Sequence, residues 1–558
     1  MYGLFKIFRM KGIKMTPEIV AKMFPNPLPS IDEIEAKYPP RTLPEGAKVM
    51  RVAPSPTGFL HVGTIYQGII AERVAHQSGG VFFVRVEDTD QKRKVEGALE
   101  LILESFPRYG LHPDEGVNMA GEDVGAYGPY TQSLRKDIYQ AYAKKLLEEG
   151  KAYPCFCTAE DVDLTRKIQE KMNIRPGYHG QYAKCRNLTD SQILEHLEAG
   201  HNWVLRFKST GNYDEKMAIK DLAKGMIMMP QNDMDIVILK NDGLPTYHFA
   251  HVVDDHLMGT THVSRGDEWI SSTPLHIQLF AAMGWKTPKY AHLATLQKLD
   301  NGNKRKLSKR HDAEASITYF WEKGYPEMTV VEYLTNILNA NFEDWRKANP
   351  TEPAEKFQMN FNKISNTGGA LFDFVKMHSI SKDVIARMTA EEVYEAVLNW
   401  ANDYNKPLAE KLSAHKDYVT AILNIERGIG AKSRKDLVKW EDVENELTFF
   451  FDDTFVAHPE LLEKFDEADV KKVASEFAAI YDENDDKDTW FGKIKQVAGN
   501  NGFATDMKAY KANPTDYKGS VADVAKILRV LVTGREQTPD LYAIMKILGK
   551  DKTLQRLG

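Results

Sequence analysis

The sequence predicts an α/β domain built on a parallel sheet, interrupted by a long insertion and followed by a helical half. Two segments, about 45–151 and 233–300, each combine short apolar strands with amphipathic helices. Roughly 80 residues separate them, which is too many for an ordinary loop. Beyond about residue 381 glycine and proline become rare, and helical periodicity dominates, as in Ala390–Trp400.

Length and composition indicate a multi-domain soluble protein. The chain has 558 residues, which corresponds to roughly three to five domains. No apolar run reaches the roughly 20 residues that a membrane-spanning helix needs. Three cysteines argue against a disulfide framework and fit a reducing cytosol. The net charge of −6 gives no global attraction to nucleic acid, so a nucleic-acid surface must come from local basic patches.

The first motif, Arg51–Thr64, follows the first predicted strand. The run 47–53 reads as a strand, and the two prolines after it prevent its continuation in a central ladder. A helix is predicted from about residue 60, so His61 and Gly63 fall at a strand–turn–helix junction. A helix N-terminus offers unpaired N–H groups and a positive dipole end to a polyphosphate, and glycine lets a nucleotide lie against the backbone. An isolated motif of this kind would more often be a solvated turn.

The second motif, Lys306–Arg310, reads Lys-Leu-Ser-Lys-Arg and follows a flexible turn at 301–303. Positive charge concentrates on both sides of this turn. One interpretation is a solvated basic loop, which is what most charge runs are. The other is a mobile loop that brings lysines to the phosphates of a nucleotide while charge develops at the α-phosphorus.

Together, in this order, the two motifs resemble the ATP-binding signatures of class I aminoacyl-tRNA synthetases, and the first resembles the bacterial glutamyl branch. The resemblance is clear over about 45–315 and weak beyond. It implies a Rossmann-type catalytic domain with an inserted acceptor-binding domain, followed by an all-α anticodon-binding half. It also implies that His61, Lys306 and Lys309 are catalytic. The residues that it implies for ATP are His61, Gly63, Asp267, Glu268, Trp269, Leu296 and Lys309.

A further string, Arg85–Asp90, ends a buried predicted strand, where ligands gather in open parallel sheets. The family has the same Arg-x-Glu-Asp-Thr-Asp string, which points to Glu87 as the partner of a substrate ammonium group. Arg265 matches a residue of the family's glutamate pocket, and a guanidinium fork suits a carboxylate. The family often has Asn at the position of His251. The residues that the resemblance implies for glutamate are Arg51, Ala53, Ser55, Glu87, Tyr247, His251 and Arg265.

Some of these residues have a structural alternative. Arg265 could form a salt bridge, because three carboxylates lie near it in sequence: Asp254, Asp255 and Asp267. Trp269 could belong to the core, which is the commoner fate of a lone aromatic side chain. Asp90 is expected to cap the helix that follows it rather than to act in catalysis.

The three cysteines offer a metal site. In some members of the family a Cys-x-Cys pair and a later cysteine bind structural zinc in the inserted domain. Zinc takes four nitrogen or sulfur ligands in a closed site, and this chain has Cys155, Cys157 and Cys185. The fourth ligand would be His179, which is the most natural in chemical terms, or one of two tyrosines, Tyr178 or Tyr182. The alternative is a buried cluster of free thiols.

The resemblance implies a ligase that activates L-glutamate with ATP and Mg²⁺ to glutamyl-adenylate and transfers glutamate to the 3′ end of tRNA(Glu). Charging of tRNA(Gln) as well stays open, and we expect a cytoplasmic monomer. The rivals are a tRNA-independent adenylate-forming ligase and a non-catalytic tRNA-binding paralogue. The expected segments are 1–44, an N-terminal extension; 45–151 and 233–310, the two catalytic halves; 152–232, the acceptor-stem insertion; 311–380, a stem-contact region; and 381–558, the anticodon-binding domain.

Overall fold

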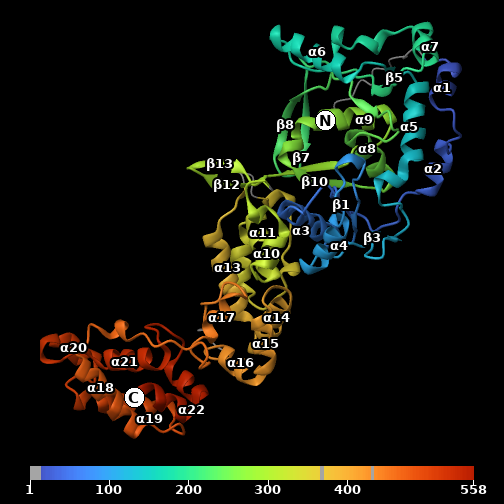
Figure 1. The fold of residues 1–558 in the computed structure, drawn as a ribbon. Coiled ribbons are helices and arrows are strands. Elements are labelled where there is room, and N and C mark those ends of the chain that lie inside the picture. Colours follow the sequence, from blue (N-terminus) through green and yellow to red (C-terminus); the bar gives the residue numbers. More distant parts are fainter. Residues whose placement is uncertain (1–13, 309, 365–369, 429–432) are drawn as a thin grey trace. The chain divides into compact units, whose positions relative to one another are not determined.

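A computed structural model describes residues 14–308, 310–364, 370–428 and 433–558 (Figure 1). The chain divides into two compact units. The first runs up to Tyr319 and includes Val331–Asp373, and the second comprises Phe320–Val330 and Phe374–Gly558. In the described ranges no helix is long and apolar enough to cross a membrane.

The centre of the first unit consists of two parallel strand pairs, one from each half of the chain, which a backbone hydrogen bond joins. Strand β1 (Val49–Val52) pairs in parallel with β2 (Val81–Val84), and helix α3 (Val62–His76) connects them. Strand β10 (His262–Gly266) pairs in parallel with β11 (Lys289–Leu293), and α9 (Thr273–Met283) connects those. The N–H of Thr261 donates to Val49 O over 3.0 Å, so β10 follows β1 in the sheet. The predicted Rossmann-type domain is therefore confirmed.

Strands β1 and β10 are buried, although they carry the charged residues Arg51 and Arg265. Every residue of β1 and β10 is buried, as expected for a parallel sheet with helices on its faces. The core beside the sheet is completed by α5 (Lys136–Glu148) and α8 (Tyr247–Leu257). The N-terminal segment joins this core through α1 (Pro17–Met23) and α2 (Ile31–Lys37).

The stretch between the two halves forms a second sheet together with the beginning of the second half. Strands β5 (Ala152–Cys155), β6 (Val204–Phe207) and β9 (Val237–Leu239) pair antiparallel in that order. The other elements of the stretch are two helices and a hairpin: α6 (Ala159–Lys171), α7 (Asp190–Glu198), β7 (Lys216–Asp221) and β8 (Gly225–Pro230). After β11, a second hairpin, β12 (Leu296–Asp300) and β13 (Asn303–Lys306), carries the lysine motif.

The second unit is helical in its described part, as the sequence predicts. One of its helices begins with a capping box of Thr389 and Glu392, which satisfies backbone donors at the helix start. Its helices are α13 (Phe374–Arg387), α14 (Ala390–Tyr404), α15 (Lys406–Ala414), α16 (Lys416–Leu423), α17 (Asp442–Leu447), α18 (Glu467–Ile480), α19 (Lys487–Asn500), α20 (Met507–Ala512), α21 (Val521–Thr533) and α22 (Leu541–Leu557).

One local prediction is wrong. Asp90 does not cap the next α-helix, because a short 3₁₀ turn, Gln91–Arg93, comes first and α4 (Ala98–Arg108) begins only after Gly97. Gly97 has φ +77°, a conformation that favours glycine and reverses the chain at that point. The Asp90 carboxylate instead accepts a hydrogen bond from Arg93 Nε over 2.6 Å.

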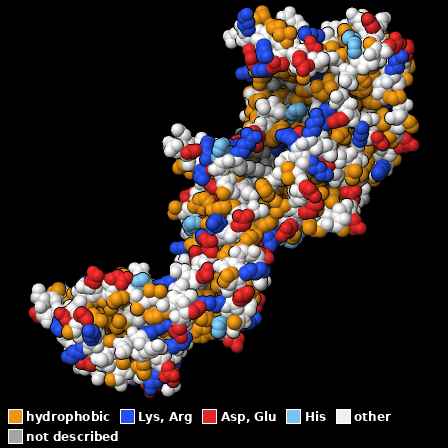
Figure 2. Space-filling view, viewed as in Figure 1, with side chains coloured by type: hydrophobic (Ala, Val, Ile, Leu, Met, Phe, Trp, Pro, Cys, Tyr) orange, Lys and Arg blue, Asp and Glu red, His pale blue; other side chains and the backbone are white. Residues whose placement is uncertain are grey.

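Acidic and basic side chains are interspersed over the face shown in Figure 2. This distribution agrees with the small net charge of −6.

Candidate active site

His61 occupies the N-terminus of α3, where the loop after β1 meets the helix. Its ring Nδ1 accepts the N–H of Gly63 over 2.8 Å, so His61 caps the helix through its side chain. Because Nδ1 is the acceptor, the ring proton sits on Nε2, which faces Leu307 O at 3.3 Å. The two sequence motifs therefore meet at this histidine.

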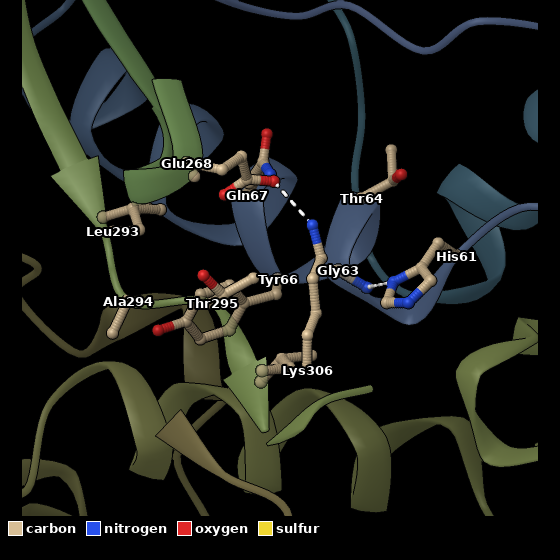
Figure 3. A pocket seen from close by; sticks show the side chains of 12 residues that line it. His61, Gly63, Thr64, Tyr66, Gln67, Glu268, Leu293, Ala294, Thr295 and Lys306 are labelled. Carbon is tan, nitrogen blue, oxygen red and sulfur yellow. Dashed lines mark hydrogen bonds and ion pairs between the residues drawn. The ribbon is translucent and has the colours of Figure 1, made fainter. Parts of the chain in front are cut away.

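A cavity of about 210 Å³ lies beside this helix start. It is bounded by α3, by the carboxyl ends of β10 and β11, and by the β12–β13 hairpin (Figure 3). Of the residues predicted for ATP, the structure brings four to this cavity, His61, Gly63, Glu268 and Leu296, together with Lys306, which was predicted to be catalytic. The other lining residues are Thr64, Tyr66, Gln67, Gly266, Leu293, Ala294 and Thr295.

Lys306 points across the cavity in Figure 3, and its Nζ lies 3.0 Å from Glu268 Oε1. The two side chains are 58% and 40% exposed, so this ion pair is solvated and weak. A more highly charged anion, such as a nucleotide phosphate, would compete for the lysine. Its predicted companion, Lys309, lies outside the residues that the structure describes.

Asp267 and Trp269 do not line this cavity. The Asp267 carboxylate accepts a short hydrogen bond from the Thr295 hydroxyl and an ion pair from Lys224 at 3.3 Å. The Trp269 ring packs on Tyr247, with ring centroids 4.5 Å apart. The structure therefore places Trp269 among the residues predicted for glutamate.

A buried charge network lies at the carboxyl ends of β1 and β2. Asp255 pairs with Arg51 at 3.1 Å and with Arg85 at 2.6 Å, and these two arginines hold the pKa of Asp255 well below its usual range even though burial opposes this. Asp254 accepts from Arg135 Nε at 2.8 Å. Both aspartates are thus occupied by arginines other than Arg265.

Arg265 has a different environment. Its side chain is buried, and no Asp or Glu oxygen lies within 4.0 Å of it in the described part of the chain. The guanidinium donates to His292 Nε2 and to His276 Nδ1, each at 3.0 Å, and to Thr273 Oγ1 at 2.8 Å. The salt bridge that the sequence left open for Arg265 is therefore not present.

The other residues predicted for glutamate come from several elements: Glu87 follows β2, Tyr247 and His251 belong to α8, and Ala53 and Ser55 follow β1. Burial raises the pKa of Glu87, which pairs with Arg85 at 2.9 Å. The His251 ring stacks at 5.9 Å on Tyr247, and burial lowers the pKa of His251 to about 4. Ala53 is half-buried and Ser55 is exposed, both just beyond β1.

The three cysteine sulfurs lie within 4.8 Å of one another. The Tyr178 hydroxyl is 3.3 Å from Cys155 Sγ and 3.4 Å from Cys157 Sγ, and it accepts the N–H of Cys185 over 3.0 Å. Hydrogen bonds from the neighbouring thiols lower the pKa of Cys155. This donor set suits a thiophilic metal.

The expected fourth ligand, His179, is not at the sulfurs. Its Nε2 faces Arg175 O at 2.9 Å and its Nδ1 lies 3.9 Å from Asp233, because the chain turns between adjacent residues and points their side chains to different sides. The Tyr182 hydroxyl faces Met172 Sδ at 3.9 Å. Of the three candidates, the structure places Tyr178 beside the cysteines.

The sequence reasoning missed several residues of the site. Tyr66 lines the cavity, is 3% exposed, and its hydroxyl has no hydrogen-bond partner among the described residues. Its spacing of three from Gly63 puts both on one face of α3, a signal that was present in the sequence. His276 and His292 contact Arg265 from two other elements, and no local pattern identifies them.

Two family models match the chain. One, described as tRNA synthetases class I (E and Q), catalytic domain, matches residues 48–366. The other, described as an anticodon binding domain, matches residues 392–558. The second match coincides with most of the helical unit.

Relatives align along nearly the whole chain. A glutamate–tRNA ligase of Clostridium perfringens (strain SM101) is 46% identical, with 96% of this chain and 97% of that protein covered. One of Acetivibrio thermocellus is 47% identical, with 96% and 98% covered. The crystal structure of glutamate-tRNA synthetase from Elizabethkingia anophelis matches with a TM-score of 0.71 at 27% identity, covering 92% of this chain and 99% of that one. By these matches, and by the two motifs that meet at His61, the chain belongs to the glutamate–tRNA ligase family of class I tRNA synthetases.

Proposed function

We propose that this chain activates L-glutamate with ATP and transfers the glutamyl group to the 3′ end of tRNA(Glu). The observation that carries the proposal is Arg265, a buried cation without a carboxylate partner in the described part of the chain. A buried charge is costly unless it is paired. The side-chain carboxylate of glutamate would supply that pairing, and the neutral amide of glutamine would not.

The reaction has two steps. An oxygen of the glutamate α-carboxylate attacks the α-phosphorus of ATP, and pyrophosphate leaves. The 2′-hydroxyl of the terminal tRNA adenosine then attacks the acyl carbon of glutamyl-adenylate, and AMP leaves. Because no covalent enzyme intermediate forms, the protein contributes positioning and charge stabilisation.

ATP would occupy the cavity between α3 and the β12–β13 hairpin. Glycine at position 63 and the start of α3 would face the phosphates, and the Nε2–H of His61 would donate to a phosphate oxygen in place of Leu307 O. Lys306 and Lys309 are our candidates for stabilising the charge that develops on the transferring group. Mg²⁺, when bound, would neutralise phosphate charge.

Glutamate would lie beside Arg265, with Tyr247 and His251 around it. The guanidinium carries five N–H groups, and four of them have partners in the described structure: His292, His276, Thr273 and the carbonyl of Trp269. One N–H on Nη1 remains for the substrate. The sequence suggested two hydrogen bonds from Arg265 to the side-chain carboxylate of glutamate. We now propose one hydrogen bond, from Nη1, together with the attraction of the positive charge. Glu87 stays our candidate partner for the ammonium group of glutamate.

A structural zinc ion would be held by Cys155, Cys157, Cys185 and Tyr178. Three clustered sulfurs and a phenol oxygen supply four donors, which is the number a closed zinc site uses. The metal would tie β5 to the segment that carries Tyr178 and Cys185. Free thiols remain the alternative.

The partners follow from the same proposal. Residues 152–232 would contact the acceptor stem, 311–380 the stem beyond it, and 381–558 the anticodon. Localisation in the cytoplasm and a monomeric state stay predictions, and whether the enzyme also charges tRNA(Gln) stays open.

Aminoacylation of purified tRNA(Glu) with labelled glutamate tests the proposal. A tRNA-independent ligase would consume ATP and glutamate without labelling tRNA. A binding paralogue would retain tRNA on a filter without any turnover.

A further inference from the structure

The hydrogen bonds around Arg265 determine the proton positions on two histidines. Every N–H of the guanidinium is a donor, so His276 Nδ1 and His292 Nε2 must both be lone-pair acceptors. The remaining proton of His276 is then on Nε2, which faces His248 Nδ1 at 3.0 Å. The remaining proton of His292 is on Nδ1, which donates to Asp221 Oδ2 at 2.6 Å. Both imidazoles are neutral in this arrangement.

Asp221 is itself fixed by the backbone. It accepts the N–H groups of Ala223 at 2.9 Å and of Lys224 at 2.8 Å, and it is 2% exposed. His292 is thus locked in the tautomer that presents a lone pair to Arg265. Burial lowers the pKa of both His276 and His292, which keeps them neutral near pH 7.

The neighbouring arginines are held differently. Arg51 and Arg85 pair with Asp255, and Arg135 pairs with Asp254, so a carboxylate compensates each of these charges. Arg265 has acceptors for four of its five N–H groups, and all four acceptors are uncharged. Its position is determined and its charge is not neutralised.

We propose that His276 and His292 are positioning residues of the glutamate site, which orient Arg265 through neutral lone pairs and thereby leave its positive charge for the side-chain carboxylate of the substrate. The inference rests on the proposed function and adds to it the source of selectivity. A carboxylate in either histidine position would orient the guanidinium equally well but would cancel the field that attracts glutamate.

Two isosteric variants separate orientation from charge. His276→Asn keeps an acceptor close to the position of Nδ1, and His276→Asp places a negative charge there with the same shape. ATP–pyrophosphate exchange in the presence of tRNA gives KM for glutamate, KM for ATP and the preference for glutamate over glutamine. A thermal melt reports whether each variant folds.

We expect His276→Asn to raise KM for glutamate only about threefold, and His276→Asp to raise it roughly 30-fold or more, on the scale of one lost charge-assisted contact. KM for ATP should stay within about twofold in both variants, because the ATP cavity is separate. The preference for glutamate over glutamine should narrow in His276→Asp alone. His292→Gln, which keeps an acceptor near the position of Nε2, should resemble His276→Asn.

Equal KM values for glutamate in the Asp and Asn variants, with both folded, would overturn the inference. So would an Asp variant that binds glutamate as the unchanged protein does. Failure of the proposed function itself would look different, since the unchanged protein would then show no glutamate-dependent exchange at all.

Discussion

Lys306 Nζ lies 3.0 Å from Glu268 Oε1, and both residues line the cavity beside the start of α3. The pair is solvent-exposed, so it adds little to folding, and the lysine is available to an incoming phosphate. Other ion pairs stabilise the β12–β13 hairpin and do not involve Lys306. Arg305 forms salt bridges with Asp312 at 2.6 Å and with Asp300 at 2.6 Å.

The first prediction concerns the lysines. Lys306→Ala and Lys309→Ala should each lower kcat by roughly 10²-fold, the scale for losing one positioned charge stabiliser. Loss of the exposed pair should cost no more than about 1 kcal/mol, so the unfolding midpoint should hardly move. An unchanged kcat with only a raised KM for ATP would show that the lysines bind ground-state phosphate.

Arg265 provides the second prediction. Arg265→Gln should lower kcat/KM for glutamate by about 30- to 1000-fold, because a charge-assisted contact worth about 2–4 kcal/mol is lost. ATP binding in the absence of glutamate should be retained, which fluorescence titration with ATP checks. Full discrimination against glutamine in this variant would mean that the selector lies elsewhere.

Tyr66 provides the third prediction. Its buried hydroxyl lines the cavity that we propose for ATP and has no partner in the described structure, so the folded protein gains no hydrogen bond from it. Tyr66→Phe should leave stability unchanged or raise it by up to about 1 kcal/mol. If the hydroxyl contacts bound nucleotide, KM for ATP should rise several-fold, while KM for glutamate stays the same. No change in either KM would assign Tyr66 to packing alone.

The fold and part of the lining of the cavity beside α3 were predictable, because both depend on local patterns. The strand, turn and helix around His61 are contiguous in sequence and form as predicted, whereas the segment before Lys306, predicted as a loop, forms strand β13 of a hairpin. The environment of Arg265 was not predictable in the same way. His276 comes from α9 and His292 from β11, so only the folded sheet brings them to the guanidinium.

The ligand geometry of the cysteines shows a second limit of the sequence. His179 is the more common zinc ligand, yet its neighbour Tyr178 contacts the sulfurs. Adjacent side chains in an irregular turn point in different directions. The preference of zinc for a histidine ligand therefore does not determine whether Tyr178 or His179 faces the cysteine sulfurs.

Metal content gives the fourth prediction. Purified protein should contain about one equivalent of zinc, and Cys157→Ala should release it. Tyr178→Phe should weaken retention of zinc against a chelator, whereas His179→Ala should leave it unchanged. Elemental analysis of fresh protein, prepared without chelators, makes the measurement. Absence of metal would favour a cluster of free thiols, and release by His179→Ala alone would contradict the role given to Tyr178.

The fifth prediction concerns pH. Burial lowers the pKa of His262 to about 4, below the value of about 6.5 expected in the unfolded chain. As pH falls from about 6.5 to about 4, the His262 imidazole binds a proton in the unfolded chain but stays neutral in the folded protein. The free energy of unfolding therefore decreases over this pH interval.

His262→Gln removes this titration at a side chain that packs on Phe361 and that we do not assign to the ATP or glutamate site. Urea unfolding of both proteins at pH 7 and pH 4.5 measures the difference. The variant should lose less stability over this interval than the unchanged protein. Equal losses would show that the acid sensitivity arises from other groups.

ATP–pyrophosphate exchange in the presence of tRNA(Glu) tests the central claim most directly, namely that the positive charge of Arg265 selects glutamate. The account predicts exchange with glutamate, little with glutamine, and loss of that preference in Arg265→Gln. Exchange that proceeds equally with both amino acids in the unchanged protein, or a preference that survives Arg265→Gln, would contradict it.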